Sequence, residues 1–112
     1  MLFLVCVTGC VTAQSGAMMR ARAGLNDKRY VFTLHRLAEA EAYHELTPEL
    51  KAEISYMKGM CYQGLSRTDE ARAMFHYTAE QFPTTEFAYM SRQKLGGDMP
   101  PPPRRNREGD DD

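Results

Sequence analysis

The sequence lacks several features that large or specialised proteins need. Its 112 residues include no Trp and only three Cys, and the formal net charge is -1. Because domains run roughly 100 to 200 residues, one small domain is the most that this length supports. No apolar run approaches the ~20 residues that cross a bilayer, which excludes a polytopic membrane protein. Without a clustered excess of Lys and Arg, the chain has no general attraction for nucleic acid.

Motifs for catalysis and metal binding are also missing. The chain has no Gly-rich phosphate loop, no Gly-x-Ser-x-Gly elbow and no His-Glu-x-x-His. Its histidines, His35, His44 and His76, include no pair at metal-ligand spacing. A small enzyme would need an essential polar cluster that the sequence does not contain. We therefore expect no catalytic residue, no cofactor and no metal site.

The first ten residues are uncharged and mostly apolar, and the first charged residue is Arg20. An apolar run of about 7 to 15 residues that ends in small residues is typical of a secretory signal. The usual positive flank is missing, so either the signal is atypical or the recorded start lies downstream of the real one. The alternative interpretation is a hydrophobic N-terminus or part of a first helix, with an incidental Cys.

The run ends in Val7-Thr8-Gly9-Cys10, which resembles the lipobox of bacterial lipoproteins. In that motif a signal peptidase cuts before the Cys, and the Cys thiol then takes diacylglycerol. The resemblance implies a signal peptide over residues 1–9, lipidation at Cys10 and a lipidated tether over residues 10–16. The acyl chains would anchor the protein in the bacterial cell envelope.

Two residues refine this expectation. Val11, instead of Asp, follows the lipobox Cys, which in such lipoproteins implies the outer membrane, facing the periplasm. Cleavage would remove Cys6 and lipidation would consume Cys10, so Cys61 would be the only free thiol. Because Cys61 falls on an apolar helical stripe, we expect it to be buried rather than to bridge two molecules.

Helical periodicity and capping residues predict five helices between residues 17 and 95, with no strand signal. A short helix is expected over about 17–24, broken by Gly24-Leu25-Asn26-Asp27, and a second over about 27–46 with Asn26 as its cap. Thr47, followed by Pro and Glu, marks the start of the third helix.

Three further signals place the remaining helices. Gly64-Leu65-Ser66 ends the third helix, and Ser66 to Asp69 has the form of a capping box for the fourth. Pro83 and the polar residues after it end the fourth helix and cap a short fifth helix that runs to about Leu95. The third helix carries two stripes of residues at helical spacing, which predicts two buried faces. One stripe is Leu50, Ile54, Met57 and Cys61, and the other is Ala52, Ser55, Gly59 and Tyr62.

Residues 52–83 resemble a tetratricopeptide repeat, a helix-turn-helix unit of 34 residues. The spacing that carries the resemblance is that of Gly59, Tyr62, Ala71, Phe75 and Pro83. Three positions depart from the pattern, because Lys58 and Ser55 stand where the family prefers Leu and a large aromatic residue, and Thr78 replaces a usual Ala.

An earlier, longer repeat is expected over about residues 17–47, because Gly24-Leu25 echoes Gly64-Leu65 at an offset of 40. The junction over residues 82–88 also resembles those of envelope repeat proteins of the cell-division coordinator and barrel-assembly lipoprotein types. The resemblance implies an all-α domain over residues 17–95, built of antiparallel helix-turn-helix repeats in a short α-solenoid. A plain array of helical hairpins is the alternative.

The composition changes at Gly96. Residues 96–112 contain four consecutive prolines and then a cluster of charges. Such a composition favours an extended, disordered tail that does not pack. It could serve as a ligand for an aromatic groove, as a spacer, or as a solvated end without a further role.

These observations predict a membrane-anchored adaptor or assembly factor that binds other envelope proteins. Thioethers and exposed tyrosines supply adaptable contact area, so the candidate partner-binding residues are Met60 and the tyrosines Tyr56, Tyr77 and Tyr89, which we expect to be exposed. Such Met residues also fill gaps in cores. Two repeats give a small concave surface, so binding is expected to need a homo-oligomer or a larger complex. The alternatives are a cytoplasmic co-chaperone or regulatory module without lipid, and a structural lipoprotein without a specific partner.

Overall fold

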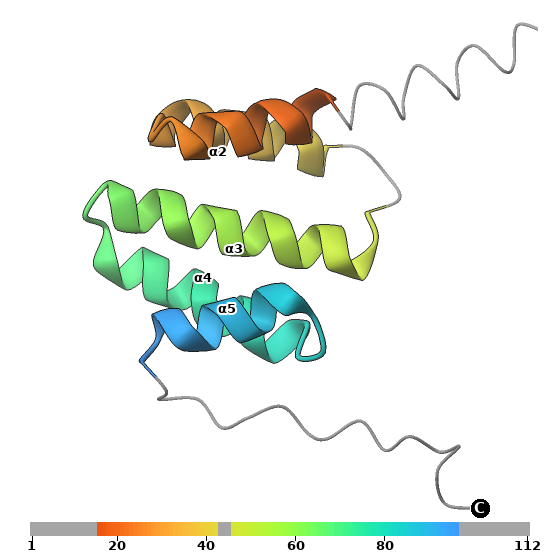
Figure 1. The fold of residues 1–112 in the computed structure, drawn as a ribbon, viewed down its shortest axis with the longest axis vertical. Coiled ribbons are helices and arrows are strands. Elements are labelled where there is room, and N and C mark those ends of the chain that lie inside the picture. The colour runs from red at the N-terminus through yellow and green to blue at the C-terminus, as the bar shows by residue number, and fades with distance from the viewer. Residues whose placement is uncertain (1–15, 43–45, 97–112) are drawn as a thin grey trace, which may run out of the picture.

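The computed structural model describes residues 16–42 and 46–96, and this part of the chain is helical (Figure 1). The N-terminal helix covers residues 16–26. It is followed by α2 (Tyr30–Glu41), α3 (Pro48–Gly64), α4 (Thr68–Gln81) and α5 (Glu86–Lys94). No strand occurs among the described residues. The prediction of an all-α domain with five helices is therefore confirmed, although α2 is shorter than expected.

Helices that follow one another in the chain lie side by side and antiparallel, and α3 lies at the centre (Figure 1). It contacts α2, α4 and α5, whereas α2 and α4 do not contact each other. The N-terminal helix enters the same core through Ala17, Met18 and Ala21. Its Arg22 donates two hydrogen bonds to the carboxylate of Glu53 on α3, at 2.6 and 2.9 Å. The N-terminal helix, α2, α4 and α5 therefore all pack on α3.

The starts of α3 and α5 follow the local capping rules. The side chain of Thr47 accepts a hydrogen bond from the Leu50 amide at 3.1 Å, and Thr85 accepts one from the Ala88 amide at 3.1 Å. Pro48 occupies the first turn of α3, where its missing N–H costs nothing. Both helix starts agree with the sequence, because a cap needs only residues that are neighbours in the chain.

Two predicted caps at the other helix boundaries are wrong. The N-terminal helix ends at residue 26, within the predicted break over residues 24–27, but Asn26 belongs to this helix and the N-cap of α2 is Arg29. A Cβ atom at Gly24 would lie 2.6 Å from Thr33 Oγ1, so this glycine serves the close approach of α2. Ser66 does not cap α4 either; the N-cap is Arg67, without a side-chain cap bond. The local sequence pattern therefore does not determine the first residues of α2 and α4.

Two of the turns between helices, the one before α2 and the one before α4, share one backbone geometry. Lys28 and Ser66 have positive φ angles of 60° and 61°. The next amide, of Arg29 or Arg67, donates a 2.8 Å hydrogen bond to the carbonyl of the residue five positions earlier. These turns are 38 residues apart, as are the capping residues Thr47 and Thr85. The offset of 38 between these turns and between these caps differs from the offset of 40 between the Gly-Leu pairs.

Replacing Ser66 by glycine is expected to stabilise the fold. A left-handed backbone costs an L-residue about 1 kcal/mol or more, and glycine adopts it freely. We therefore expect Ser66→Gly to raise the free energy of unfolding by about 0.5–1 kcal/mol, measured by urea denaturation. Ala73→Gly, on the exposed side of α4, is the matched control and should lower it by about 1 kcal/mol. A loss in both variants would contradict the strain at Ser66.

Candidate functional site

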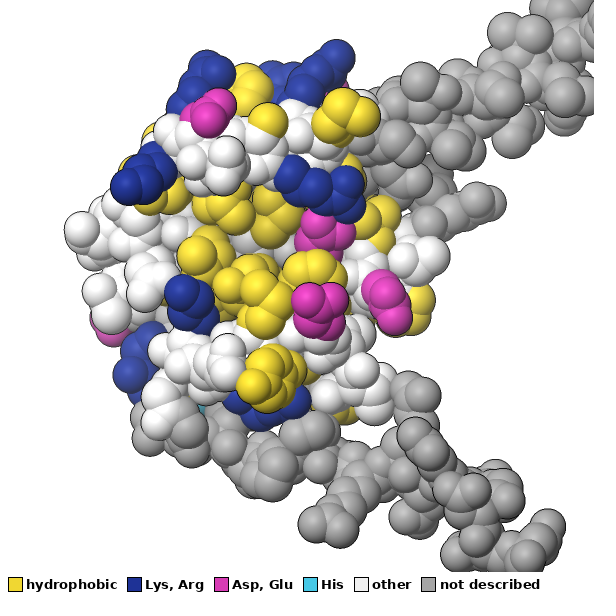
Figure 2. Space-filling model, in the orientation of Figure 1, with side chains coloured by type: hydrophobic (Ala, Val, Ile, Leu, Met, Phe, Trp, Pro, Cys, Tyr) yellow, Lys and Arg dark blue, Asp and Glu magenta, His cyan; other side chains and the backbone are white. Residues whose placement is uncertain are grey.

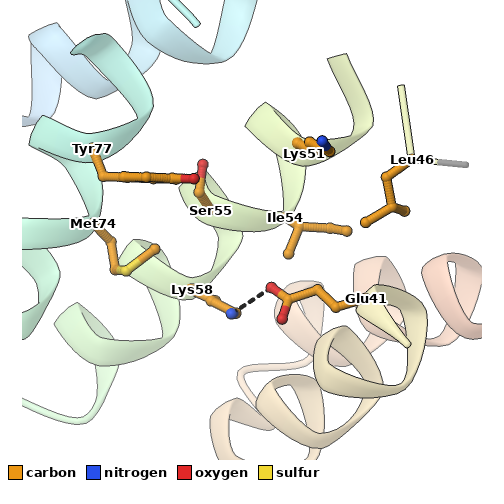
Figure 3. Close-up of a pocket in the computed structure, with 8 residues that line it drawn as sticks. All are labelled: Glu41, Leu46, Lys51, Ile54, Ser55, Lys58, Met74 and Tyr77. Carbon is orange, nitrogen blue, oxygen red and sulfur yellow. Dashed lines mark ion pairs between the residues drawn. The ribbon is translucent and has the colours of Figure 1, made fainter. Parts of the chain in front are cut away.

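A pocket of about 550 Å³ opens between α2 and α4, with α3 beneath it (Figure 3). It exists because α3 holds α2 and α4 apart. The lining side chains come from α2, the segment before α3, α3 itself and α4; they are Glu41, Leu46, Lys51, Ile54, Ser55, Lys58, Met74 and Tyr77. Its volume lies in the range of pockets that hold small ligands or side chains.

Charged groups lie at both ends of the pocket (Figure 3). The ammonium of Lys58 forms an ion pair with the carboxylate of Glu41, the last residue of α2. The last turn of α2 carries no basic residue of its own, so Lys58 also opposes the negative end of the α2 dipole. At the other end, the exposed Lys51 forms no ion pair with a described residue. The described lining residues therefore include two cations, Lys51 and Lys58, and one anion, Glu41.

The base of the pocket contains a buried pair of hydroxyl groups. Ser55 Oγ and Thr78 Oγ1 lie 2.6 Å apart. Ser55 Oγ also lies 3.0 Å from the Ala52 carbonyl oxygen, and Thr78 Oγ1 lies 2.8 Å from the Met74 carbonyl oxygen. Because each hydroxyl has a single proton, one of them donates to its carbonyl and accepts from the other hydroxyl. Two of the three departures from the tetratricopeptide pattern thus contact each other. Two small side chains with a shared hydrogen bond fill the space between α3 and α4 where the family pattern has an aromatic residue and Ala.

The residues that carry the repeat resemblance lie at or near the contact between α3 and α4. The ring of Phe75 lies against Gly59, where a Cβ atom would approach Phe75 Cε1 to 2.6 Å. Ala71 and Phe75 are buried, whereas Tyr62 and Pro83 are half-buried. Pro83 follows Phe82, the C-cap of α4. Of these five residues, Gly59 and Phe75 form a close contact.

The predicted partner-binding residues divide into a core residue and surface residues. Tyr56 is only 7% exposed, and its ring centroid lies 5.8 Å from those of Phe75 and Phe87. The expectation that Tyr56 is exposed is therefore wrong. Tyr77 and Tyr89 are 48% and 57% exposed. Burial raises the pKa of Tyr56, which keeps this phenol neutral in the core.

A second apolar surface lies on the face made by the N-terminal helix, α3 and α5. Figure 2 shows hydrophobic side chains gathered over the middle of this face, with Lys, Arg, Asp and Glu side chains around them. The half-buried hydrophobic residues of these helices are Leu25, Leu50, Met60, Tyr62, Phe87 and Met90. Met60 lies on α3 and does not line the pocket, whereas Met74 and Tyr77 line it from α4.

Cys61 is fully buried, as the apolar stripe predicts. Burial raises the pKa of its thiol from the ordinary 9.0 to about 11. The protonated thiol is a poor nucleophile at neutral pH. Within residues 16–42 and 46–96, no three His, Cys, Asp or Glu side chains gather in a way that would hold a metal ion.

Other predictions fall outside the described residues. These include the signal peptide, the lipidation site Cys10 with most of its tether, and nearly all of the tail over residues 96–112. Within the part that the structure describes, no helix combines the length and apolar character needed to span a membrane.

Comparison of the chain with known protein families, with curated proteins and with solved structures finds no match.

Proposed function

We propose that the chain is a membrane-anchored adaptor of the bacterial envelope whose helical body binds a segment of a partner protein. Lipid on Cys10 would hold residues 17–95 close to the membrane and raise their effective concentration toward envelope proteins. The lipobox resemblance at residues 7–10 supports the anchor. In this role the chain carries out no reaction and needs no cofactor.

The observation that carries the binding role is the pocket between α2 and α4. These helices stand apart on α3, and the pocket between them exposes Met74 and the ring of Tyr77. A recess of this volume with apolar side chains in its wall can receive a side chain of a partner segment. The exposed Tyr89 and the apolar face over α3 add further contact area.

The body is proposed to be a short array of tetratricopeptide-like repeats. The turn and the helix cap that recur after 38 residues support this proposal. At this offset, Ala17 and Ala40 correspond to Ser55 and Thr78, and all four are buried small residues. A repeated unit would place the same close helix contact in both hairpins.

The anchor is tested by the intact mass of the chain, expressed with its natural upstream region and extracted from membranes. We expect the mass of residues 10–112 plus diacylglycerol, with or without a further acyl chain. The Cys10→Ser variant should lack this addition and leave the membrane fraction. An unmodified wild-type chain that retains Met1 in the soluble fraction would contradict the anchor and favour a cytoplasmic interaction module.

The adaptor role is tested by crosslinking in intact cells. Envelope proteins that are enriched with the wild-type chain, but not with Cys10→Ser, would be its partners. If the lipidated chain enriches no envelope protein, the adaptor role fails and a purely structural lipoprotein is the better account.

A further inference from the structure

We infer that the pocket between α2 and α4 binds a partner segment in which a bulky apolar side chain lies next to an acidic residue. The apolar side chain would enter the pocket, and its neighbouring carboxylate would contact Lys51. This inference rests on the proposed adaptor role and specifies the chemistry of the partner.

The interior of the pocket is suited to an apolar side chain. Leu46, Ile54 and Met74 contribute aliphatic and thioether surface, and the ring of Tyr77 extends over α3 toward Ser55 (Figure 3). The hydroxyl of Ser55 is already hydrogen-bonded to Ala52 and Thr78, so it has little capacity for a polar ligand. A volume of about 550 Å³ accommodates one large side chain together with part of its backbone.

The charges select the sign of the neighbouring group. Lys51 and Lys58 are seven residues apart on α3, which places them two helical turns, or about 10 Å, from each other along the helix axis. Glu41 neutralises Lys58, whereas Lys51 has no ion pair within the described part of the chain. A carboxylate at the Lys51 end would balance the excess cation, and a cationic segment would be repelled.

A protein segment other than the tail of this chain fits these requirements. Asp110 to Asp112 supply carboxylates, but no bulky apolar residue stands beside them in the sequence. Met99 stands next to Asp98, but both lie within three residues of Gly96, just after α5. Figure 1 shows the end of α5 on the opposite side of the molecule from the start of α3, where Lys51 lies, and α5 lines no part of the pocket. The prolines after Met99 are followed by Arg residues, which Lys51 would repel. The occupant is therefore expected to be a partner protein that presents the apolar and the acidic group together.

The test is selection of a random 12-residue peptide library, displayed on phage, against the immobilised full chain. We expect the enriched peptides to share a large apolar residue next to Asp or Glu. Synthetic copies of these peptides are then titrated against purified variants by fluorescence anisotropy. Lys51→Glu should weaken binding by about tenfold, because it exchanges an attraction for a repulsion. Met74→Glu, which places a charge in the pocket, should abolish binding.

Matched controls separate the pocket from general effects of charge. Arg20→Glu makes the same charge change as Lys51→Glu at an exposed position of the N-terminal helix, and Met19→Glu matches Met74→Glu at an apolar residue that is 67% exposed. Neither residue lines the pocket, so both variants should bind the peptides like the wild type. Circular dichroism of each variant establishes that it is folded before binding is compared.

Three outcomes would overturn the inference. Enriched peptides that lack an acidic residue would remove the role of Lys51. Peptides that bind Met74→Glu and Lys51→Glu as tightly as the wild type would place the partner on another face and leave the adaptor role intact. Sedimentation of the wild type as a dimer, with Met74→Glu monomeric, would make a second copy of the chain the occupant.

Discussion

Truncating Tyr56 is expected to cost more stability than truncating either of the other candidate tyrosines. The ring of Tyr56 contacts Phe75 on α4 and Phe87 on α5, each at a centroid distance of 5.8 Å. Removing such a buried aromatic ring leaves a cavity between three helices. We expect Tyr56→Ala to lower the free energy of unfolding by about 3–5 kcal/mol, measured by urea denaturation followed by circular dichroism.

The other tyrosines provide the controls for this prediction. Tyr77→Ala and Tyr89→Ala remove rings that are about half exposed, so each should change stability by less than about 1 kcal/mol. Tyr56→Phe keeps the ring and should also cost less than about 1 kcal/mol. If Tyr56→Ala is as mild as Tyr89→Ala, Tyr56 is not a core residue and returns to the candidate binding surface.

Adding a methyl group at Gly59 is expected to destabilise the protein even though Ala is the better helix former. The new Cβ atom would lie 2.6, 2.8 and 3.0 Å from three atoms of the Phe75 ring. That ring is only 3% exposed and also contacts Tyr56, so it has no open direction in which to move. The helix propensity gain is at most about 1 kcal/mol. We expect a net loss of about 1–3 kcal/mol in the free energy of unfolding.

Two further variants isolate the contact between Gly59 and Phe75. Gly16→Ala makes the same chemical change where no atom lies within 4 Å, so it should be neutral or slightly stabilising. Phe75→Leu replaces the ring by a smaller side chain, and the double variant should be more stable than the sum of the single effects predicts. Thermal melting gives an independent readout, because 1 kcal/mol shifts the melting temperature by about 4–8 °C in a domain of this size. A Gly59→Ala variant as stable as Gly16→Ala would show that the helices separate without cost.

The residues proposed for binding differ from those that pack the interior. Tyr56, Gly59 and Phe75 lie in the packed interior, whereas Lys51 and Tyr77 lie at the edge of the pocket. Variants at the pocket edge can therefore test binding without unfolding the chain. This separation makes the effects of Lys51→Glu interpretable as changes in affinity.

The sequence alone determined the features that depend on chain neighbours. The caps at Thr47 and Thr85, the helical class of the domain and the burial of Cys61 follow from local hydrogen bonding and helical periodicity.

The tertiary structure decided the features that depend on distant neighbours. Tyr56 lies outside both predicted stripes of α3, and it is buried because α5 adds a third packing partner. The left-handed Ser66 is set by the geometry of the turn between α3 and α4, which overrides its capping tendency. The pocket exists only because α3 separates α2 from α4. Periodicity identifies which faces of a helix are apolar, but the arrangement of the other helices determines which of those faces are covered.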